Sequence, residues 1–460
     1  MRATTLDAYN LLHRGSEALG RAERQGMRID VDYCKRMTKR LTYRIEKAST
    51  KFDESDLGRK WRRRYGGNYN ANSDQQLRHM LYDQLGLQPY KLTNSGEGST
   101  DEESLLSLGI PEIRYLLKRR KLTKTRDTYL GSFIREQRFG EIHPFFHLHS
   151  VHSYRSSSAD PNFQNIPEHD KEAKRLCQRA VYPRKGHKIK KADFGMLEVC
   201  ISACYNKDPK LIEYINDPSS DMHGDSAKDL FLLDSLDKSI PEDKWLRFCA
   251  KNSFVFAEFY GSYYEDCAVN LANQISMPSE GTWRSGQGVM LPGEYHISDH
   301  MRSKGITSFS KFEDRVKEAE RVLWEDRFPV YADWRKRWFK QYEKRGYFDL
   351  LTGFRCSGVY GRNQTFNLPV QGAAFHCLLW AFIRVDEIMR EEGWDTKLIG
   401  EVHDDMMLDV HPDEEEHVDA TIHRVVSEEL PKAWPWIIVP LRIEINTGPV
   451  DGSLYTVGDG

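Results

Sequence analysis

Two adjacent acids stand at the tip of a predicted hairpin in KLIGEVHDDMMLDV, residues 397–410. Apolar residues alternate before and after Asp404 and Asp405, which is the period-two pattern of β-strands. Two neighbouring carboxylates that face the same space repel each other unless a cation lies between them, and an all-oxygen ligand set favours Mg²⁺. Aspartate is also common in solvated turns, so this stretch alone favours an ordinary hairpin. The metal interpretation depends on the rest of the chain.

A further acid lies upstream in HKIKKADFGMLEVC, residues 187–200. The pattern predicts a strand that runs into Asp193, followed by a helix from Leu197. An acid at a strand end contributes little to packing but is well placed to hold a ligand. Asp193 is therefore a second candidate for a cation site.

Cations and aromatic residues share one predicted helix in EDKWLRFCAKNSFVFAEFYGSYYED, residues 242–266. Arg247 and Lys251 are four positions apart, a spacing that places both on one helix face. Phe256 and Tyr260 follow with the same spacing. This combination suits a triphosphate below a stacked base, although cations on a helix more often mark a solvated face.

Other basic and polar residues gather in three stretches. RKWRRRYGG at 59–67 and LLKRRKLTKTRDTY at 116–129 are basic, and the second carries little opposing charge. Charge runs usually mark a solvated surface, but uncompensated cations also suit a phosphate backbone. SYRSSSADPNFQNIP at 153–167 supplies hydroxyls, amides and Arg155, which can hydrogen-bond sugars, phosphates and minor-groove acceptors.

The composition limits the fold without selecting a partner. The 460 residues correspond to about three domains or subdomains, and 39% hydrophobic residues suffice for folded cores. A net charge of -2 leaves nucleic acid open, since a neutral protein can carry a basic groove. The eight cysteines include no CxxC pair, which favours buried core thiols in a reducing compartment. No signal segment and no run of 18 apolar residues occurs, so a soluble, cytoplasmic protein without a membrane partner is expected.

The elements that must position these residues are mostly helical. Residues 1–50 predict helices broken at Gly26, and Asn72 or Ser73 can cap the next one. Residues 277–312 are rich in Gly, Ser and Pro and are expected to form an insertion. The absence of internal repeats and low-complexity linkers favours subdomains of one interwoven unit.

Several of these strings together resemble the family A DNA polymerases, the group of bacterial DNA polymerase I and related phage enzymes. SYRSSSADPNFQNIP is similar to the family's TGRLSSSDPNLQNIP, and KKADFGMLEVC, RFCAKNSFVFAEFYG, FNLPVQGAA and EVHDD resemble its catalytic and fingers motifs in the family's order. DMHGDSAKDLF resembles its DIHT segment. The resemblance runs from about residue 15 to the C-terminal strand, and five ordered strings make unrelated motifs improbable.

The resemblance implies an α+β right-hand fold with an antiparallel palm sheet and mostly helical thumb and fingers. We expect the thumb, with a short palm-joining segment, at 1–145, the first part of the palm at 146–225, the fingers with the insertion at 226–350, and the rest of the palm at 351–460. The implied activity is template-directed addition of dNTPs to a primer 3′-hydroxyl. The implied partners are primer-template DNA and dNTPs.

The resemblance also implies residue roles. Two Mg²⁺ ions, with Mn²⁺ as an alternative, would be held by Asp193, Asp404 and the backbone carbonyl of Phe194, while Lys251 would protonate the leaving pyrophosphate. The remaining implied roles are the triphosphate contacts Arg247 and His223, the sugar gate Glu198, the aromatic residues Phe256 and Tyr260, and the DNA contacts Arg155, Asn367, Gln371, His403 and Lys124.

Three positions depart from the family pattern. Asp405 replaces the usual Glu and is expected either to bind metal or to support Asp404, and Met196 replaces a common Gln. Lys251 and Tyr260 are nine positions apart where the family has eight. One extra residue turns an α-helix by about 100°, so we predict a π-bulge between Lys251 and Phe256 that keeps the cations and aromatics in place.

Further expectations concern the wider system. Met1 falls near the start of the family's thumb, so we expect no proofreading exonuclease in this sequence and a separate exonuclease or processivity protein as a partner. The compact layout is associated with phage enzymes, which would place the protein in a bacterial host cytoplasm.

Two alternatives remain at this stage. A single-subunit RNA polymerase shares the two aspartates and the fingers Lys and Tyr, but Glu198 argues against it. A catalytically silent DNA-binding subunit would have to explain why Asp193, Asp404, Arg247 and Lys251 are all present.

Overall fold

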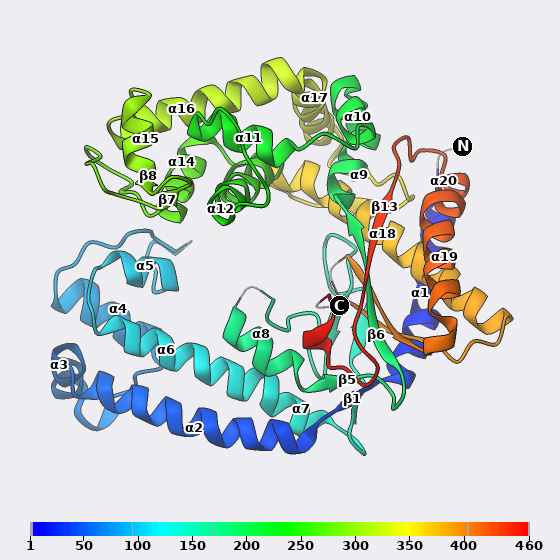
Figure 1. Cartoon of the computed structure of the whole chain (residues 1–460), viewed down its shortest axis with the longest axis horizontal. Helices are drawn as coiled ribbons and strands as arrows, with labels where there is room; N and C mark the ends of the chain where they lie inside the picture. The colour runs from blue at the N-terminus through cyan, green and yellow to red at the C-terminus, as the bar shows by residue number, and fades with distance from the viewer. Residues whose placement is uncertain (1–2, 94, 169, 403, 459–460) are drawn as a thin grey trace.

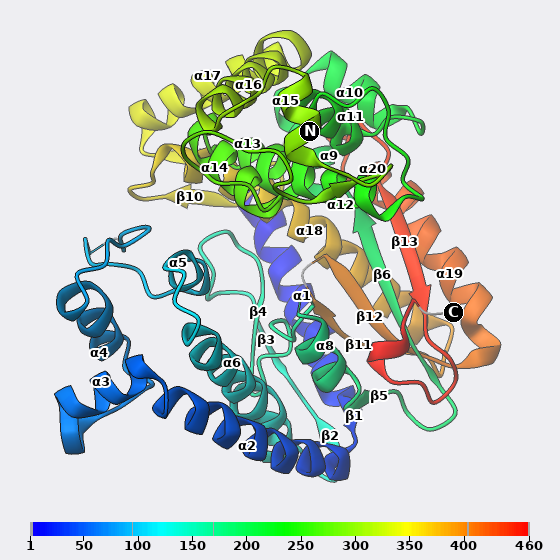
Figure 2. The same ribbon diagram turned by 60° about the vertical axis from the view of Figure 1, so that its left-hand side comes forward.

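The computed structural model describes residues 3–93, 95–168, 170–402 and 404–458. Its elements form three parts, and Figures 1 and 2 show one helical arm at the lower left, a second helical part above it and a twisted sheet with flanking helices at the right. These parts correspond to the thumb, fingers and palm, which confirms the expected α+β hand.

The palm is built on a four-stranded antiparallel sheet in the order β11–β12–β6–β13. The strands are β6 (Lys188–Gly195), β11 (Lys397–Val402), β12 (Asp405–Val410) and β13 (Arg442–Thr447). The predicted hairpin is confirmed as β11 and β12, which pair from Lys397↔Asp409 to Val402↔Asp405. Strand β6 lies between β12 and β13, so residues far apart in sequence meet at the centre of the sheet.

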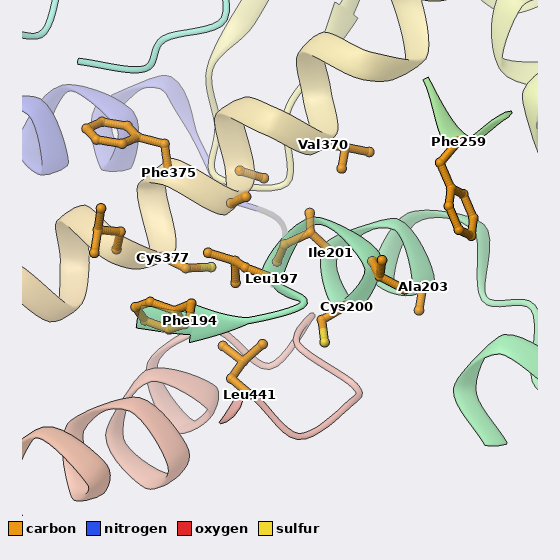
Figure 3. Close-up of a cluster of buried hydrophobic side chains, with 14 of the residues drawn as sticks. Phe194, Leu197, Cys200, Ile201, Ala203, Phe259, Val370, Phe375, Cys377 and Leu441 are labelled. Carbon is orange, nitrogen blue, oxygen red and sulfur yellow. The ribbon is translucent and has the colours of Figure 1, made fainter. Parts of the chain in front are cut away.

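Helices cover the palm sheet and form the largest core. They are α1 (Thr5–Gln25), α9 (Leu197–Asn206), α18 (Arg362–Glu391), α19 (Glu415–Arg424) and α20 (Leu430–Ala433). Figure 3 shows Phe194 of β6 gathered with Leu197, Cys200 and Leu441, and with Cys377 of α18. Phe194 therefore points into the core, because successive side chains of a strand point to opposite faces. Its neighbour Asp193 lies on the other face.

The position of α1 differs from the expected thumb range. Its buried residues Leu11, Ala18 and Leu19 belong to the palm core, and α1 packs against α18 and β11. The apolar face predicted for the first helix is thus present, but it covers the palm. Sequence position alone could not show this, because an amphipathic helix does not specify its partner.

Helix α18 is long and apolar enough to span a membrane by length and composition alone. Its most apolar window has a mean hydropathy of 1.3, and 78% of that window is buried inside the protein. Packing against α1, α9 and α17 (Pro329–Arg345) accounts for this apolar character.

The thumb is a helical arm with its own core. It contains α2 (Val31–Asp53), α3 (Asp56–Tyr65), α4 (Asp74–Arg78), α5 (Glu102–Ser107), α6 (Ile113–Thr123) and α7 (Gly131–Glu136). Ser73 caps α4 by accepting a hydrogen bond from the Gln76 amide, as its sequence position predicts. Trp61 and Phe52 are fully buried in this arm.

Small sheets connect the thumb to the palm. Strand β1 (Met27–Ile29) pairs with β2 (Glu141–Ile142) and β5 (Val181–Tyr182), and β3 (Phe145–His147) pairs with β4 (Ser157–Ala159). Helix α8 (Lys171–Gln178) precedes β5. All eight cysteines are free and buried, which confirms their assignment to the core.

The fingers contain α10 (Pro209–Asn216), α11 (Met222–Phe231), α12 (Pro241–Ala250), α13 (Phe256–Phe259), α14 (Tyr264–Gln274), α15 (Ile297–Ser303), α16 (Phe309–Arg321) and α17. The hairpin β7 (Met290–Leu291) and β8 (Tyr295–His296) lies within the expected insertion, and β9 (Tyr347–Asp349) and β10 (Arg355–Ser357) lead back to the palm. The Asn273 side chain of α14 donates to the Tyr90 hydroxyl over 2.8 Å, so the fingers touch the thumb.

The predicted π-bulge is confirmed. Residues Lys251–Val255 form a π-helical segment between α12 and α13. The wider turn absorbs the extra residue, so Phe256 and Tyr260 remain on the side of the helix that faces His223 and the palm.

Candidate active site

Carboxylates from three strands meet on one face of the palm sheet. Asp193 of β6 is directly opposite Asp405 of β12 and Glu444 of β13. Asp404 precedes β12, and its backbone carbonyl accepts a hydrogen bond from the Phe194 amide over 3.4 Å. Like charges directly opposite each other destabilise a sheet, and a nearby cation reduces this repulsion.

The electrostatics of the cluster show the same repulsion. Burial, together with the charges of Asp405, Asp404 and Glu444, raises the pKa of Asp193 to about 7. Burial, with Glu198 and Asp405 and against the opposing effect of Arg155, raises the pKa of Asp404 to about 6. Both shifts favour the neutral acid; burial contributes most, and the neighbouring carboxylates add to it.

The donor set fits a divalent cation with oxygen ligands. Within the described ranges, Asp404 Oδ1 is buried without a hydrogen-bond partner, and Arg155 Nη2 is 3.9 Å away. No three acidic, His or Cys residues among those the structure describes form a complete metal shell. Asp193 and Asp404 can therefore hold a cation only if other oxygens, such as those of a bound substrate, complete its coordination.

Asp405 differs from Asp404 in its neighbouring cation, which is Lys191 for Asp405 and Arg155 for Asp404. Lys191 Nζ lies 3.4 Å from Asp405 Oδ2 and 3.3 Å from Glu168. Lys191 is 17% exposed, so this pairing is little screened by water. This contact supports the expectation of a supporting role for Asp405 over that of a metal ligand.

A chain of hydrogen bonds joins the fingers helix to the palm. The Tyr260 hydroxyl donates to Glu198 Oε2, and Arg155 Nη2 donates to Glu198 Oε1 over 2.5 Å. Arg155 lies in turn beside Asp404. Glu198, Tyr260, Phe256 and Asn367 line one small cavity of about 30 Å³, so residues predicted from three separate motifs meet at one place.

The fingers bring cations together around a neutral histidine. Arg247 binds Asp221, and Lys251 Nζ lies 5.2 Å from the centre of the Phe256 ring. The His223 ring packs edge-on against Phe256 with centroids 5.5 Å apart. Burial, with the charges of Arg247 and Lys251, lowers the pKa of His223 to about 4. The predicted triphosphate contacts thus form one positively charged cluster.

Comparisons with known proteins agree with this geometry. A sequence model described as DNA polymerase family A matches residues 31–283 and 312–453. The chain belongs to DNA polymerase family A. The gap in the match, 284–311, falls within the range expected as an insertion.

Relatives and solved structures of family A cover nearly the whole chain. The thermostable DNA polymerase I of Thermus filiformis is 27% identical over 439 residues, and the DNA polymerase I of Bacillus subtilis strain 168 is 25% identical over 437 residues; each alignment covers 94% of this chain. The chain spans about half the length of these curated relatives, 46% and 44% respectively. The POL domain of Pol1 from M. smegmatis, in complex with DNA primer-template and dNTP, has a similar fold, with a TM-score of 0.72 at 23% identity over 96% of this chain and 70% of that one.

The residues expected to contact DNA come from the thumb, the polar stretch at 153–167 and α18. Lys124 of the thumb and Asn162, Gln164 and Asn165 of the polar stretch line one groove of about 540 Å³. On α18, the Asn367 side chain donates to the Tyr260 carbonyl over 2.8 Å, and Gln371 is half-buried one turn further on. His403 lies outside the described residues.

Three residues that sequence reasoning missed belong to this family A site. Glu444 faces Asp193 because of the register between β6 and β13. The alternation of apolar and polar residues in β13 does not specify that register. Glu401 is buried, accepts hydrogen bonds from Ser156 and from Gln164 over 2.5 Å, and has its pKa raised to about 7 by burial. Asp221 lies two residues before His223 in DMHGDSAKDLF, and this proximity could have identified it as a site residue from the sequence.

Proposed function

We propose that this chain is the polymerase module of a template-directed DNA polymerase, which adds dNTPs to a primer 3′-hydroxyl. The observation that carries the proposal is the pairing of an acid site on the palm with a cation cluster on the fingers, joined through Tyr260, Glu198 and Arg155. An acid site can hold cations, and a cation cluster can hold a polyphosphate. Primer extension needs both.

The palm residues would hold the reacting groups. Asp193 and Asp404 fit two Mg²⁺ ions, with Mn²⁺ as an alternative and the Phe194 carbonyl as a further ligand; when bound, such ions stabilise the charge that develops on the attacking and leaving oxygens. Asp405, paired with Lys191, would fix the turn that presents Asp404. The primer oxygen forms a bond to the α-phosphorus as the bond to pyrophosphate breaks.

The fingers residues would hold the nucleotide and complete the proton balance. Arg247, Lys251 and neutral His223 offer donors to the triphosphate. Lys251 Nζ carries a proton that it can pass to the leaving pyrophosphate oxygen. The proton of the primer hydroxyl leaves to solvent or to a nearby carboxylate.

Sugar selection would come from Glu198. Donors from Tyr260 and Arg155 fix its carboxylate beside the cavity that Phe256 also lines. A fixed carboxylate there crowds a ribose 2′-hydroxyl and leaves room for a deoxyribose. This arrangement supports a deoxynucleotide substrate over a ribonucleotide.

Primer extension with Mg²⁺ tests the proposal directly. We expect the wild type to extend a primer with dNTPs, and Asp404→Ala to lose extension while it retains DNA affinity. The matched control is Asp413→Ala, because the Asp413 side chain is 92% exposed and lies 3.9 Å from His411. Undiminished synthesis by Asp404→Ala would refute the metal role, and DNA binding without extension by the wild type would favour the silent DNA-binding alternative.

A further inference from the structure

A partly buried carboxylate lies among the fingers cations where an anionic substrate is expected. Arg247 donates from Nε to Asp221 Oδ1 and Oδ2 over 3.0 and 2.9 Å, and from Nη2 to Oδ1 over 2.8 Å. The Asp221 side chain is 15% exposed. An acid next to a triphosphate site would repel the substrate unless it serves another purpose.

The geometry of the Arg247 pair leaves one edge of the guanidinium available. The contacts to Asp221 use Nε and Nη2, which form one side of the planar group. Nη1 lies on the opposite side, so Arg247 can keep Asp221 and still donate to a phosphate oxygen. A guanidinium held at one edge has a fixed direction at the other.

A lysine outside the recognised motifs balances the charge of Asp221. Lys238 Nζ lies 3.0 Å from Asp221 Oδ2, and the Lys238 side chain is 63% exposed. Its loop is anchored, because the Asp237 amide donates to Asp243 Oδ2 of α12 over 2.8 Å. The charged groups around His223 are the cations Lys238, Arg247 and Lys251 and the carboxylate Asp221. These four residues together carry a net positive charge.

The backbone makes room for this carboxylate. A Cβ atom at Gly224 would lie 2.5 Å from Asp221 Oδ2, which is closer than side chains approach in folded proteins. Although burial opposes it, the hydrogen bonds from Arg247 and Lys238 hold the pKa of Asp221 well below its usual range. Asp221 is therefore charged and fixed at neutral pH.

We infer that Asp221 is a positioning residue for the nucleotide: its carboxylate orients Arg247 toward the triphosphate, while Lys238 offsets its negative charge. This inference rests on the proposed function, since it assigns the triphosphate to the Arg247 site. Asp221 touches neither the reacting atoms nor the substrate. Its effect is expected in nucleotide binding and not in the rate of the chemical step.

The test is single-nucleotide addition measured over a range of dNTP concentrations. In Asp221→Ala, Arg247 must be ordered by the substrate itself, so we expect the KM for dNTP to rise about three- to tenfold with kcat within about twofold. Asp221→Glu should recover part of the loss, because it keeps the carboxylate. Tripolyphosphate, which has no base or sugar, should show the same loss of affinity as a competitor.

Asp225→Asn is the matched control. It removes a carboxylate from the same helix one turn on, where Asp225 pairs with Lys228 at 2.7 Å, and its KM should equal that of the wild type. Lys238→Ala tests the same inference if the Asp221 variants fail to fold. The Lys238 side chain is largely exposed, so its removal should leave the fold intact. The substitution removes one of the two cations that pair with Asp221, so the KM should rise by a smaller factor.

An unchanged or lowered KM in Asp221→Ala would overturn the inference, and a lowered KM would mean that Asp221 competes with the triphosphate for Arg247. An unchanged KM in Lys238→Ala would overturn the balancing role. A wild type that does not extend primers would instead defeat the proposed function. These outcomes are distinguishable because each depends on a different variant.

Discussion

The palm and the fingers each hold a cluster of like charges, but the opposite charges beside them lie closer on the fingers, since Lys191 is 3.4 Å from Asp405 on the palm and Arg247 is 2.8 Å from Asp221 on the fingers. On the palm, Asp193, Asp404 and Glu444 lie together, and Arg155 reaches only to 3.9 Å from Asp404. On the fingers, Asp221 lies between Arg247 and Lys238. The contacts of the described residues therefore balance charge more fully on the fingers than on the palm.

Burial and neighbouring charges shift the pKa of a group upward on the palm and downward on the fingers. Nearby carboxylates raise the pKa of Asp193, and nearby cations lower the pKa of His223. In both cases burial contributes most, and the neutral form is favoured. In the proposed function, the palm receives a cation and the fingers receive a polyphosphate.

The largest loss of primer extension is expected when the two acids that face each other across β6 and β12 are replaced one at a time. Asp193→Asn should slow primer extension about 10³-fold, because it removes a charge that no other residue replaces. Asp405→Asn should cost about 10–100-fold, since Asp405 already pairs with Lys191 and acts through the turn. Single-turnover extension rates at saturating Mg²⁺ measure both. Equal losses would remove the distinction between ligand and supporting residue.

A smaller effect is expected on the fingers, where other cations remain. Lys251→Ala should lower kcat about 100-fold, because it removes the proton donor to pyrophosphate. Lys251→Arg keeps the charge but cannot release a proton, so it should recover nucleotide binding and not the rate. Lys244→Ala, an exposed residue of the same helix, serves as the control. A fully active Lys251→Arg would show that charge alone is needed.

The sequence predicts some features of the fold and the site and leaves others undetermined. The hairpin acids, the strand end at Asp193 and the π-bulge follow from alternation, motif order and residue counting. The cross-strand position of Glu444, the placement of α1 on the palm and the pairing of Asp221 with Lys238 depend on tertiary register and packing. A period of apolar residues shows that a face is buried, but it does not identify what buries it.

Within the fingers, the charge of Arg247 lowers the pKa of His223, and this coupling can be measured. The pKa of His223 is about 4 in the folded protein and 6.5 for an ordinary histidine, so His223 is neutral at pH 7. The folded protein therefore loses stability as the pH falls from 6.5 toward 4. Arg247→Ala removes one of the cations that lower the pKa, so the pKa of His223 should rise. Arg247→Lys should leave it close to the wild-type value. An NMR titration of the His223 ring in the three proteins measures this shift, and identical values would contradict the coupling.

The smallest expected effect tests the link between the two regions. Tyr260→Phe removes one of the two donors that fix Glu198 and keeps the aromatic ring and its stacking. One lost hydrogen bond of about 1 kcal/mol should reduce the preference for dNTPs over rNTPs about fivefold, measured as a ratio of kcat/KM values. Tyr263→Phe is the control, because the Tyr263 hydroxyl accepts from Arg362 and not from the Glu198 network. An unchanged preference in Tyr260→Phe would mean that Arg155 alone holds Glu198, and that the fingers do not contribute to sugar selection through this contact.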